Sequence, residues 1–359
     1  MRQSTQSVWS PRWLMLALVL VSGCTFAALE RSEPHPLPFA PPRGDFVQVA
    51  EPICLDTYPN ITDVPDGLRT GYTGNPATDT ALDFRGVTVE FNPPLNGWNP
   101  SGSKNVCVVG GEWIGQAPRT LTWRQSKDEW DGSAIRVAHL VTTFTWENVF
   151  IDNSHDGIML PRTPDVPDTA EGIVRGSIVR YNRDDCIESD GGAAVTVDDS
   201  FFECNMFFSM RNSNTGGKDG SQSHVIVRNS LIHMMCMPDD RADGGHCPNV
   251  TPTSAVAQIW KLGKNSTALP IEMHDSIILV DAASKNGAGR MWLNQYGNNT
   301  YDNVTIVWMG GGPWPGPDKP PGVAVTDDIR VWNKARDEWF VAHNCDTGGY
   351  NCFSGNWDN

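Results

Sequence analysis

The sequence predicts an all-β protein built as a solenoid of stacked parallel strands. Short runs rich in Val, Ile, Phe and Thr recur every 20–30 residues, turn residues separate them, and helical periodicity is almost absent. One turn of such a coil cannot bury its own apolar face, so successive turns must stack on one another.

A strand–turn–strand pattern recurs through the middle of the chain. Each copy has a short β-prone run, an Asn, a few mostly polar residues and a second short run. Asn153, Asn182 and Asn205 fall at one phase of the pattern, so we expect them to form one column of stacked turn residues. The clearest copies span residues 148–158, 177–187 and 200–210; shorter ones begin at 229, 275 and 303, and 87–89 and 106–109 fit earlier turns of the coil.

This pattern resembles the right-handed parallel β-helices of the pectate-lyase and polygalacturonase type. The resemblance covers roughly residues 80–310, is one of architecture rather than strict motif, and implies a right-handed parallel β-helix. The alternative is a β-sandwich or jelly roll, in which strands recur about every 8–12 residues. The longer period found here fits that alternative poorly.

The first 45 residues are predicted to export and tether the protein. A nine-residue apolar run, Trp13–Val21, is too short to span a bilayer but suits the core of a secretory signal. The run ends in Val21-Ser22-Gly23-Cys24, which resembles a bacterial lipobox and implies a signal peptide over residues 1–23 with lipid attached to Cys24. By the same resemblance, Thr25 favours the Gram-negative outer membrane. An ordinary secretory signal with a chance cysteine is the alternative.

The remaining chain is expected to form a tether, a β-helix and a cap. Residues 24–45 include five prolines within 34–42, which favour an extended spacer. The β-helix is assigned to residues 46–310. Residues 311–359 are predicted to be a loop-rich C-terminal cap with a short helix near 334–343, because the end of a solenoid exposes strand edges and apolar core.

Composition and charge restrict the partners. The 359 residues carry a formal net charge of −15, which argues against a nucleic-acid binder because phosphate contacts need clustered Lys and Arg. Only 19% of the residues are charged, which argues against a coiled coil. We therefore expect a monomer whose partners are a polysaccharide and, through the lipid, a membrane.

Eight cysteines besides Cys24 indicate disulfides in an exported chain. Two pairs close in sequence are predicted to staple loops, and Cys54–Cys107 is a further predicted pair. Cys186 and Cys204 are expected to be buried free thiols. No pair has zinc-ligand spacing with nearby histidines, so a zinc site is discounted. The two loop staples are Cys236–Cys247 and Cys345–Cys352.

The acidic segment 182–192 is the strongest candidate for a functional site. Aligning Ile158 with Ile187 places Asp156 beside Asp185 on neighbouring strands, about 4.8 Å apart. Carboxylates this close repel each other, so one pKa should rise or a cation should lie between them. Three interpretations stay open: a general acid with its base, drawn from Asp156, Asp184, Asp185 and Glu188; a Ca²⁺ site held by Asp184 and Asp185; or ordinary turn acids.

The run Asp184-Asp185-Cys186-Ile187 is similar to a stretch of polygalacturonases, which hydrolyse a polymer of uronic acids. By position, Asp184 and Asp185 match the family's catalytic pair and Asp156 matches the Asp on its preceding strand, which implies acid–base roles for them. The chain departs from the family because it contains neither His-Gly nor Arg-x-Lys. A true polygalacturonase is therefore not expected.

Binding residues are expected beyond the acids. Taking Ile187 and Met210 as inward-facing places Glu188 and Arg211 outward on neighbouring strands. Arg211 would then bind a sugar carboxylate, since guanidinium suits bidentate contact; the alternative is a surface salt bridge of little energetic value.

Further candidates lie in loops and among the 14 tryptophans. Lys218 and His224 follow Arg211 in a long polar stretch and are candidate bases for β-elimination. Sugar faces stack on aromatic rings, so Trp260, Arg290 and Trp292 are candidates for the rim of a glycan cleft. The alternatives are that Lys218 and His224 are ordinary solvated loop residues and that the tryptophans pack in the core.

Together these features predict a surface-tethered, carbohydrate-active enzyme that cleaves a polysaccharide by hydrolysis or β-elimination. If the resemblance extends to the substrate, this polysaccharide contains uronate. The alternative is a non-catalytic surface β-helix that binds glycan or serves as a scaffold. The two functions differ in one structural respect, which is whether the acidic side chains lie together with cationic side chains and aromatic rings in one place.

Overall fold

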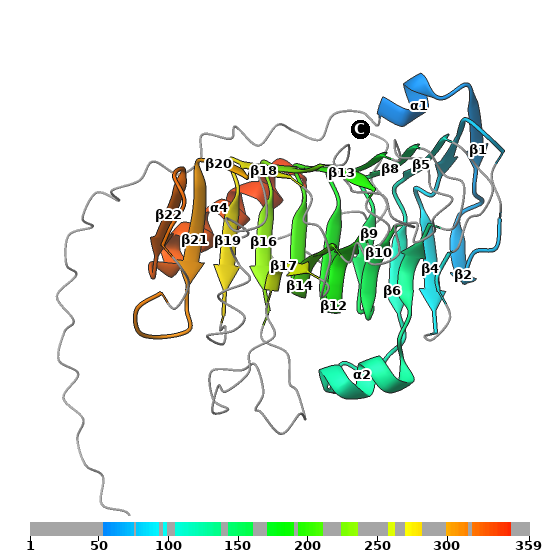
Figure 1. Ribbon diagram of the computed structural model, residues 1–359. Coiled ribbons are helices and arrows are strands. Elements are labelled where there is room, and N and C mark those ends of the chain that lie inside the picture. The colour runs from blue at the N-terminus through cyan, green and yellow to red at the C-terminus, as the bar shows by residue number, and fades with distance from the viewer. Residues whose placement is uncertain are drawn as a thin grey trace, which may run out of the picture. The chain divides into compact units, whose positions relative to one another are not determined.

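The protein is an all-β parallel β-helix, as the sequence predicts, and the sandwich alternative is wrong (Figure 1). The computed structural model describes residues 53–74, 77–92, 96–98, 105–137, 143–160, 171–189, 193–210, 224–235, 258–262, 270–281, 299–314 and 318–345. No helix among these residues is long and apolar enough to cross a membrane.

Two parallel sheets carry the coil, and each turn of the chain adds one strand to both. The nine-stranded sheet consists, in spatial order, of β1 (Asn60–Asp63), β3 (Thr80–Asp83), β5 (Asn105–Val109), β8 (Thr143–Glu147), β11 (Glu171–Arg175), β13 (Ala194–Asp198), β15 (Val225–Arg228), β18 (Ile271–His274) and β20 (Thr300–Asp302). The main path of the 13-stranded sheet consists of β2 (Gly67–Thr70), β4 (Val87–Phe91), β6 (Glu112–Gly115), β9 (Phe150–Asp152), β12 (Ile178–Glu188), β14 (Phe201–Met210), β16 (Leu231–Met234), β19 (Ile277–Val280), β21 (Val304–Trp308) and β22 (Val323–Thr326).

A third face branches from the 13-stranded sheet, and this face carries the candidate site. It arises because β12 and β14 are long enough to turn a corner and pair again beyond it. The third face consists of β7 (Ser133–Arg136), β10 (Asp156–Met159), the C-terminal parts of β12 and β14, and β17 (Gln258–Leu262), paired in that order.

The corner between the two sheets explains the repeated turn residues. A residue with positive φ lies one or two positions before most strands on the main path of the 13-stranded sheet, and Asn, Asp and Gly adopt this conformation at the least cost. A buried serine usually follows, and its hydroxyl accepts a hydrogen bond from the main-chain N–H one turn earlier. These serines form a continuous ladder along the coil: Ser177, Ser200, Ser230 and Ser276. The corner residues are Asn148, Gly176, Asp199, Asn229, Asp275 and Asn303.

The predicted asparagine column is only partly what the structure contains. Asn153, Asn182 and Asn205 lie in or directly after the adjacent strands β9, β12 and β14. Their side-chain amides donate to main-chain carbonyls instead of to one another. A register shift between Val179 and Asn182 makes Cys204, not Asn205, the Cα partner of Asn182, and this breaks the column.

The coil interior is apolar and dense with aromatic rings. The side chains of Trp113, Trp146 and Trp308 are buried in the main core, where Trp98 stacks on Trp113 with ring centroids 6.2 Å apart. These tryptophans therefore stabilise the fold by packing.

The C-terminal region adds a strand and a helix to the coil. β22 pairs with β21, so the sheet continues past residue 310. α4 (Ile329–Ala342) is longer than the helix expected near 334–343, and its buried Trp332, Trp339 and Phe340 pack on the outer face of the 13-stranded sheet against Phe201 and its neighbours (Figure 1).

One disulfide fastens the N-terminal helix to the coil, and another joins two neighbouring turns. Cys54, in the short helix α1 (Ile53–Thr57), is bonded to Cys107 as predicted. Cys186 and Cys204 are also bonded to each other, so the expectation of free thiols is wrong: pairing of β12 with β14 brings their Cα atoms to 5.8 Å. Cys345 is disulfide-bonded as well, but its predicted partner Cys352 lies outside the described residues, as do Cys236 and Cys247.

Candidate active site

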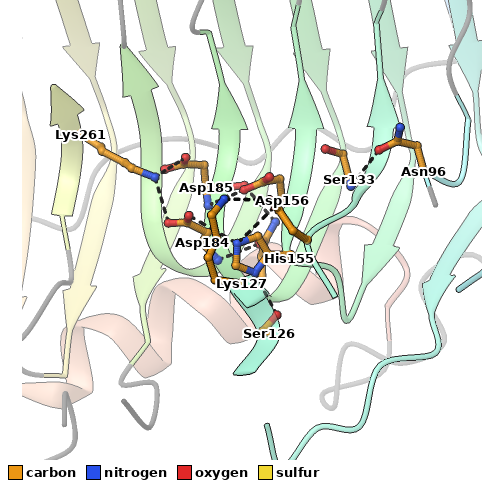
Figure 2. A network of polar contacts seen from close by, with 11 residues as sticks. Asn96, Ser126, Lys127, Ser133, His155, Asp156, Asp184, Asp185 and Lys261 are labelled. Carbon is orange, nitrogen blue, oxygen red and sulfur yellow. Dashed lines mark hydrogen bonds and ion pairs between the residues drawn. The ribbon is translucent and has the colours of Figure 1, made fainter. Parts of the chain in front are cut away.

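The acids singled out in the sequence converge on the third face (Figure 2). Ile158 pairs with Ile187, so the predicted alignment of these two strands is confirmed. The main-chain N–H of Asp185 lies 3.4 Å from Asp156 Oδ1 and donates a hydrogen bond to it. Asp156, Asp184 and Asp185 are all at most 3% exposed, so nearly all of their charge is removed from water.

A lysine two strands away neutralises part of this charge. Lys261 lies on β17, and its Nζ donates to Asp184 Oδ1 at 3.0 Å and to Asp185 Oδ2 at 2.7 Å. It reaches across β14, where its register partner is the small residue Ser209. A cation thus lies between two of the carboxylates, one of the two outcomes expected from their proximity.

A histidine contacts the cluster from the opposite side. His155, directly before β10, places Nε2 3.5 Å from Asp184 Oδ2. Its Nδ1 is hydrogen-bonded at 2.9 Å to the hydroxyl of Ser126, in α2 (Trp123–Glu129). α2 lies in the segment between β6 and β7. Lys127 on this helix interacts electrostatically with Asp156 and Asp184.

Burial and these cations push the carboxylate pKa values apart. Burial alone would raise the pKa of Asp184, but Lys261 and His155 hold it well below its usual range. Burial raises the pKa of Asp185 well above its usual value, and the charges of Asp184 and Asp156 add to this effect against that of Lys261. Burial and Asp184 also raise the pKa of Asp156. The cluster therefore favours the ionised form of Asp184 and disfavours the ionised form of its neighbour Asp185.

The same cluster contains the residues best placed to hold a metal ion. Oxygen atoms of Asp156, Asp185 and Glu188 lie within 4.8 Å of one another, and all three side chains are buried. The pair predicted for Ca²⁺, Asp184 and Asp185, instead shares the ammonium of Lys261. The structure thus supplies a built-in cation where a metal ion was the expected alternative.

The expected pairing of Glu188 with Arg211 is wrong in register. Ile187 pairs with Phe208, not Met210, because β12 and β14 differ by two residues in the length of their bends. The register partner of Glu188 is consequently Ser209. Arg211 itself lies outside the described residues, as do Lys218, Arg290, Trp292 and Cys24.

Two other predicted binding residues lie elsewhere. Trp260 is 1% exposed and packs against Phe207 and Phe208 in the core, so its assignment to a cleft rim is wrong. His224 lies directly before β15 in the nine-stranded sheet, where its carbonyl accepts from the Val195 N–H. It takes no part in the described contacts among the acids.

The sequence indicates Lys261 only as a neighbour of Trp260 in a candidate cleft rim, and His155 only as the neighbour of Asp156; neither is predicted to contact the acids. The signal for Lys261 is the alternation of sides along a strand: when Trp260 faces the core, the next side chain faces outward. That β17 lies two strands from β12 could not be deduced from the sequence.

Comparison with known proteins gives no independent guide. No protein-family model, curated protein or solved structure matches the chain.

Proposed function

We propose that the protein is a polysaccharide-cleaving hydrolase, with Asp185 as general acid and Asp184 as general base. The observation that carries the proposal is that two adjacent buried carboxylates share Lys261, in surroundings that lower the pKa of Asp184 and raise that of Asp185. Neighbouring carboxyl groups whose environments push their pKa values apart are the usual arrangement for glycoside hydrolysis.

The hydrogen bonds of Asp185 fit the role of a proton donor. Its Oδ2 accepts from Lys261, whereas its buried Oδ1 has no hydrogen-bond partner among the residues that the structure describes. A proton on the carboxyl group is therefore best placed on Oδ1, from which it can pass to the oxygen of the leaving sugar. Asp184 stays ionised and can take a proton from the attacking water.

Hydrolysis is favoured over β-elimination by the state of the nitrogen groups. Elimination needs a base that removes a carbon-bound proton. Burial would lower the pKa values of Lys261 and His155, but the surrounding carboxylates raise both above their usual values. Both shifts favour the protonated forms, which cannot act as bases, and hydrolysis does not require the expected bases Lys218 and His224.

The resemblance to polygalacturonases supports a uronate-containing substrate, since Asp184, Asp185 and Asp156 match the family's acids by position. The lipobox-like sequence at Cys24 supports attachment to the outer membrane. A lipid-tethered enzyme would act on polysaccharide at the cell envelope.

A non-catalytic role is the second candidate, and the burial of the acids favours it. Asp184 is 2% exposed and Asp185 1% exposed, so a polymer reaches them only if covering groups move. In that case the cluster is a buried ionic network and the protein binds glycan or serves as a scaffold.

One enzymatic screen separates these functions. Purified full-length protein is incubated with plant and algal polysaccharides, and reducing ends and unsaturated uronate products are measured separately. We expect reducing ends without unsaturation, and loss of nearly all activity in both Asp184→Asn and Asp185→Asn. The matched control is Asp198→Asn, which removes a carboxylate paired with Arg228 in the nine-stranded sheet and should retain activity. Cleavage that survives in Asp185→Asn would refute the assignment of the site.

A further inference from the structure

The segment that carries α2, residues 120–131, leaves the coil between two anchored ends (Figure 1). Just before it, main-chain carbonyl groups within residues 115–119 accept hydrogen bonds from side chains of the coil. Two of these bonds come from Asn153, one from Arg183 and one from Tyr181. Just after it, the chain enters β7, which pairs with β10. The main chain is therefore held in place on both sides of this segment.

Between these anchors, the segment contributes nothing to the apolar core. It contains Leu121, Trp123 and Trp130, yet none of its side chains belongs to a buried apolar cluster of the described residues. α2 has only seven residues, and an isolated helix of that length is not stable in water. Regions with few buried apolar contacts open at a low cost in free energy. We therefore expect this segment to detach from the coil more easily than the strands separate.

The segment meets the candidate site at the side chain of His155. The hydroxyl of Ser126 is hydrogen-bonded to Nδ1 of this histidine at 2.9 Å, and both side chains are at most 1% exposed (Figure 2). An oxygen of Asp131 lies 3.7 Å from Nε2, and the ring centroids of Trp123 and His155 are 6.2 Å apart. The same Nε2 lies 3.5 Å from Asp184. One side chain thus links three positions of the segment to the proposed base.

We propose that residues 120–131 are a lid that moves away from His155 and so admits a polysaccharide chain to Asp184. The admission of substrate rests on the proposed hydrolase function, whereas the opening of the lid does not. Opening breaks one hydrogen bond and a few weak contacts without exposing apolar core. The anchored ends return the lid to the same place. This movement reconciles the burial of the acids with access for a polymer.

Hydrogen exchange of the full-length protein, followed by mass spectrometry, tests the lid. In the wild type, amides of residues 123–130 should exchange roughly a hundredfold faster than those of β12. Ser126→Ala removes the hydrogen bond to His155 and should accelerate lid exchange roughly fivefold, while exchange of β12 stays unchanged. The direction is diagnostic. Alanine is the stronger helix former, so it would slow exchange if the helix opened independently of His155.

The matched control is Ser133→Ala, which should leave lid exchange unchanged. It makes the same change at a buried serine of β7 whose hydroxyl has no hydrogen-bond partner among the described residues. A second measurement uses any polysaccharide that the wild type cleaves. Because apparent affinity scales with the fraction of open molecules, KM should fall roughly fivefold in Ser126→Ala and stay constant in Ser133→Ala.

The outcomes separate the lid from the proposed function. Lid exchange as slow as that of β12, or no acceleration in Ser126→Ala, overturns the inference. Accelerated exchange with an unchanged KM overturns the admission of substrate by the lid. Accelerated exchange in a protein that cleaves no polysaccharide supports the lid and refutes the hydrolase instead.

Discussion

Two rows of charged residues run across neighbouring strands of this coil, and they differ in how charge is ordered. On the outer face of the 13-stranded sheet, Asp152, Arg180, Glu203 and His233 follow one another across β9, β12, β14 and β16. This set, which we call the outer row, alternates acid and base. Arg180 Nε donates to Glu203 Oε2 at 2.8 Å, and His233 Nδ1 lies 3.6 Å from Glu203 Oε1.

The third face instead stacks acid on acid. Asp156 and Asp185 are direct neighbours, with Asp184 alongside. In the outer row burial would favour the neutral forms, but hydrogen bonds from His233 and Arg180 lower the pKa of Glu203 to about 2, and the contacts of His233 with Asp281 and Glu203 raise its pKa to about 9. The same stacking geometry therefore favours the charged forms of Glu203 and His233 where signs alternate, and disfavours ionisation of Asp156 and Asp185 where they repeat.

We propose that the alternating row serves stability and that the row of like charges serves chemistry. The shifted pKa values of Glu203 and His233 keep both groups charged near neutral pH. A row of like charges lowers the free energy of unfolding, and groups with strongly perturbed pKa values cluster at functional sites. Substitutions in both rows and removal of metal ions test this contrast.

Removing the lysine of the third face should cause the largest loss. Lys261→Met leaves Asp184 and Asp185 buried without their cation, which typically costs about 3–5 kcal/mol of unfolding free energy. Urea denaturation measures the loss. Lys334→Met, which breaks an exposed pair with Glu338 on α4, is the control and should cost less than about 0.5 kcal/mol. Similar losses in both variants would mean that the cluster is not a distinct buried network.

Neutralising one acid should separate activity from stability. Asp185→Asn removes the proposed proton donor, so activity should be nearly abolished. The melting temperature should change little, because burial already disfavours the ionised form of Asp185 and an asparagine amide oxygen can still accept from Lys261 Nζ. Calorimetry beside the cleavage assay checks both quantities. A lower melting temperature would mean that the ionised carboxylate stabilises the fold, either through Lys261 or through a Ca²⁺ ion, and EDTA treatment would distinguish the two.

The outer row should make the free energy of unfolding decrease at alkaline pH. The pKa of His233 is raised above its unfolded value near 6.5, so its contribution is fully present below that pH and is lost as the pH rises through about 9. The contribution is about 2 kcal/mol after allowance for solvent screening. Urea denaturation at several pH values should show this loss in the wild type and a flatter curve in His233→Gln. Equal slopes in the two proteins would contradict the assigned role.

Metal removal should have the smallest effect. Because Lys261 already shares Asp184 and Asp185, dialysis against EDTA should leave the melting temperature of the full-length protein unchanged. A decrease that added Ca²⁺ reverses would show that Asp156, Asp185 and Glu188 bind a cation in addition to the lysine.

The sequence by itself determined the solenoid and one strand alignment of the site. Turn residues such as Asn229 and Asp275 recur before apolar runs because every corner needs the same backbone conformation, and this local requirement is visible without a structure. Ile158 and Ile187 could be aligned because both face the core at the same point of successive turns.

Tertiary structure alone decided what surrounds the acids. The bends of β12 and β14 differ in length, which shifted the partner of Glu188 to Ser209 and brought Cys186 to Cys204. Lys261 reaches Asp184 from 77 residues away, because β17 adds to the third face after a long excursion of the chain. Sequence patterns report local conformation and burial, whereas the distance between residues on different turns depends on the summed length of every bend and loop between them.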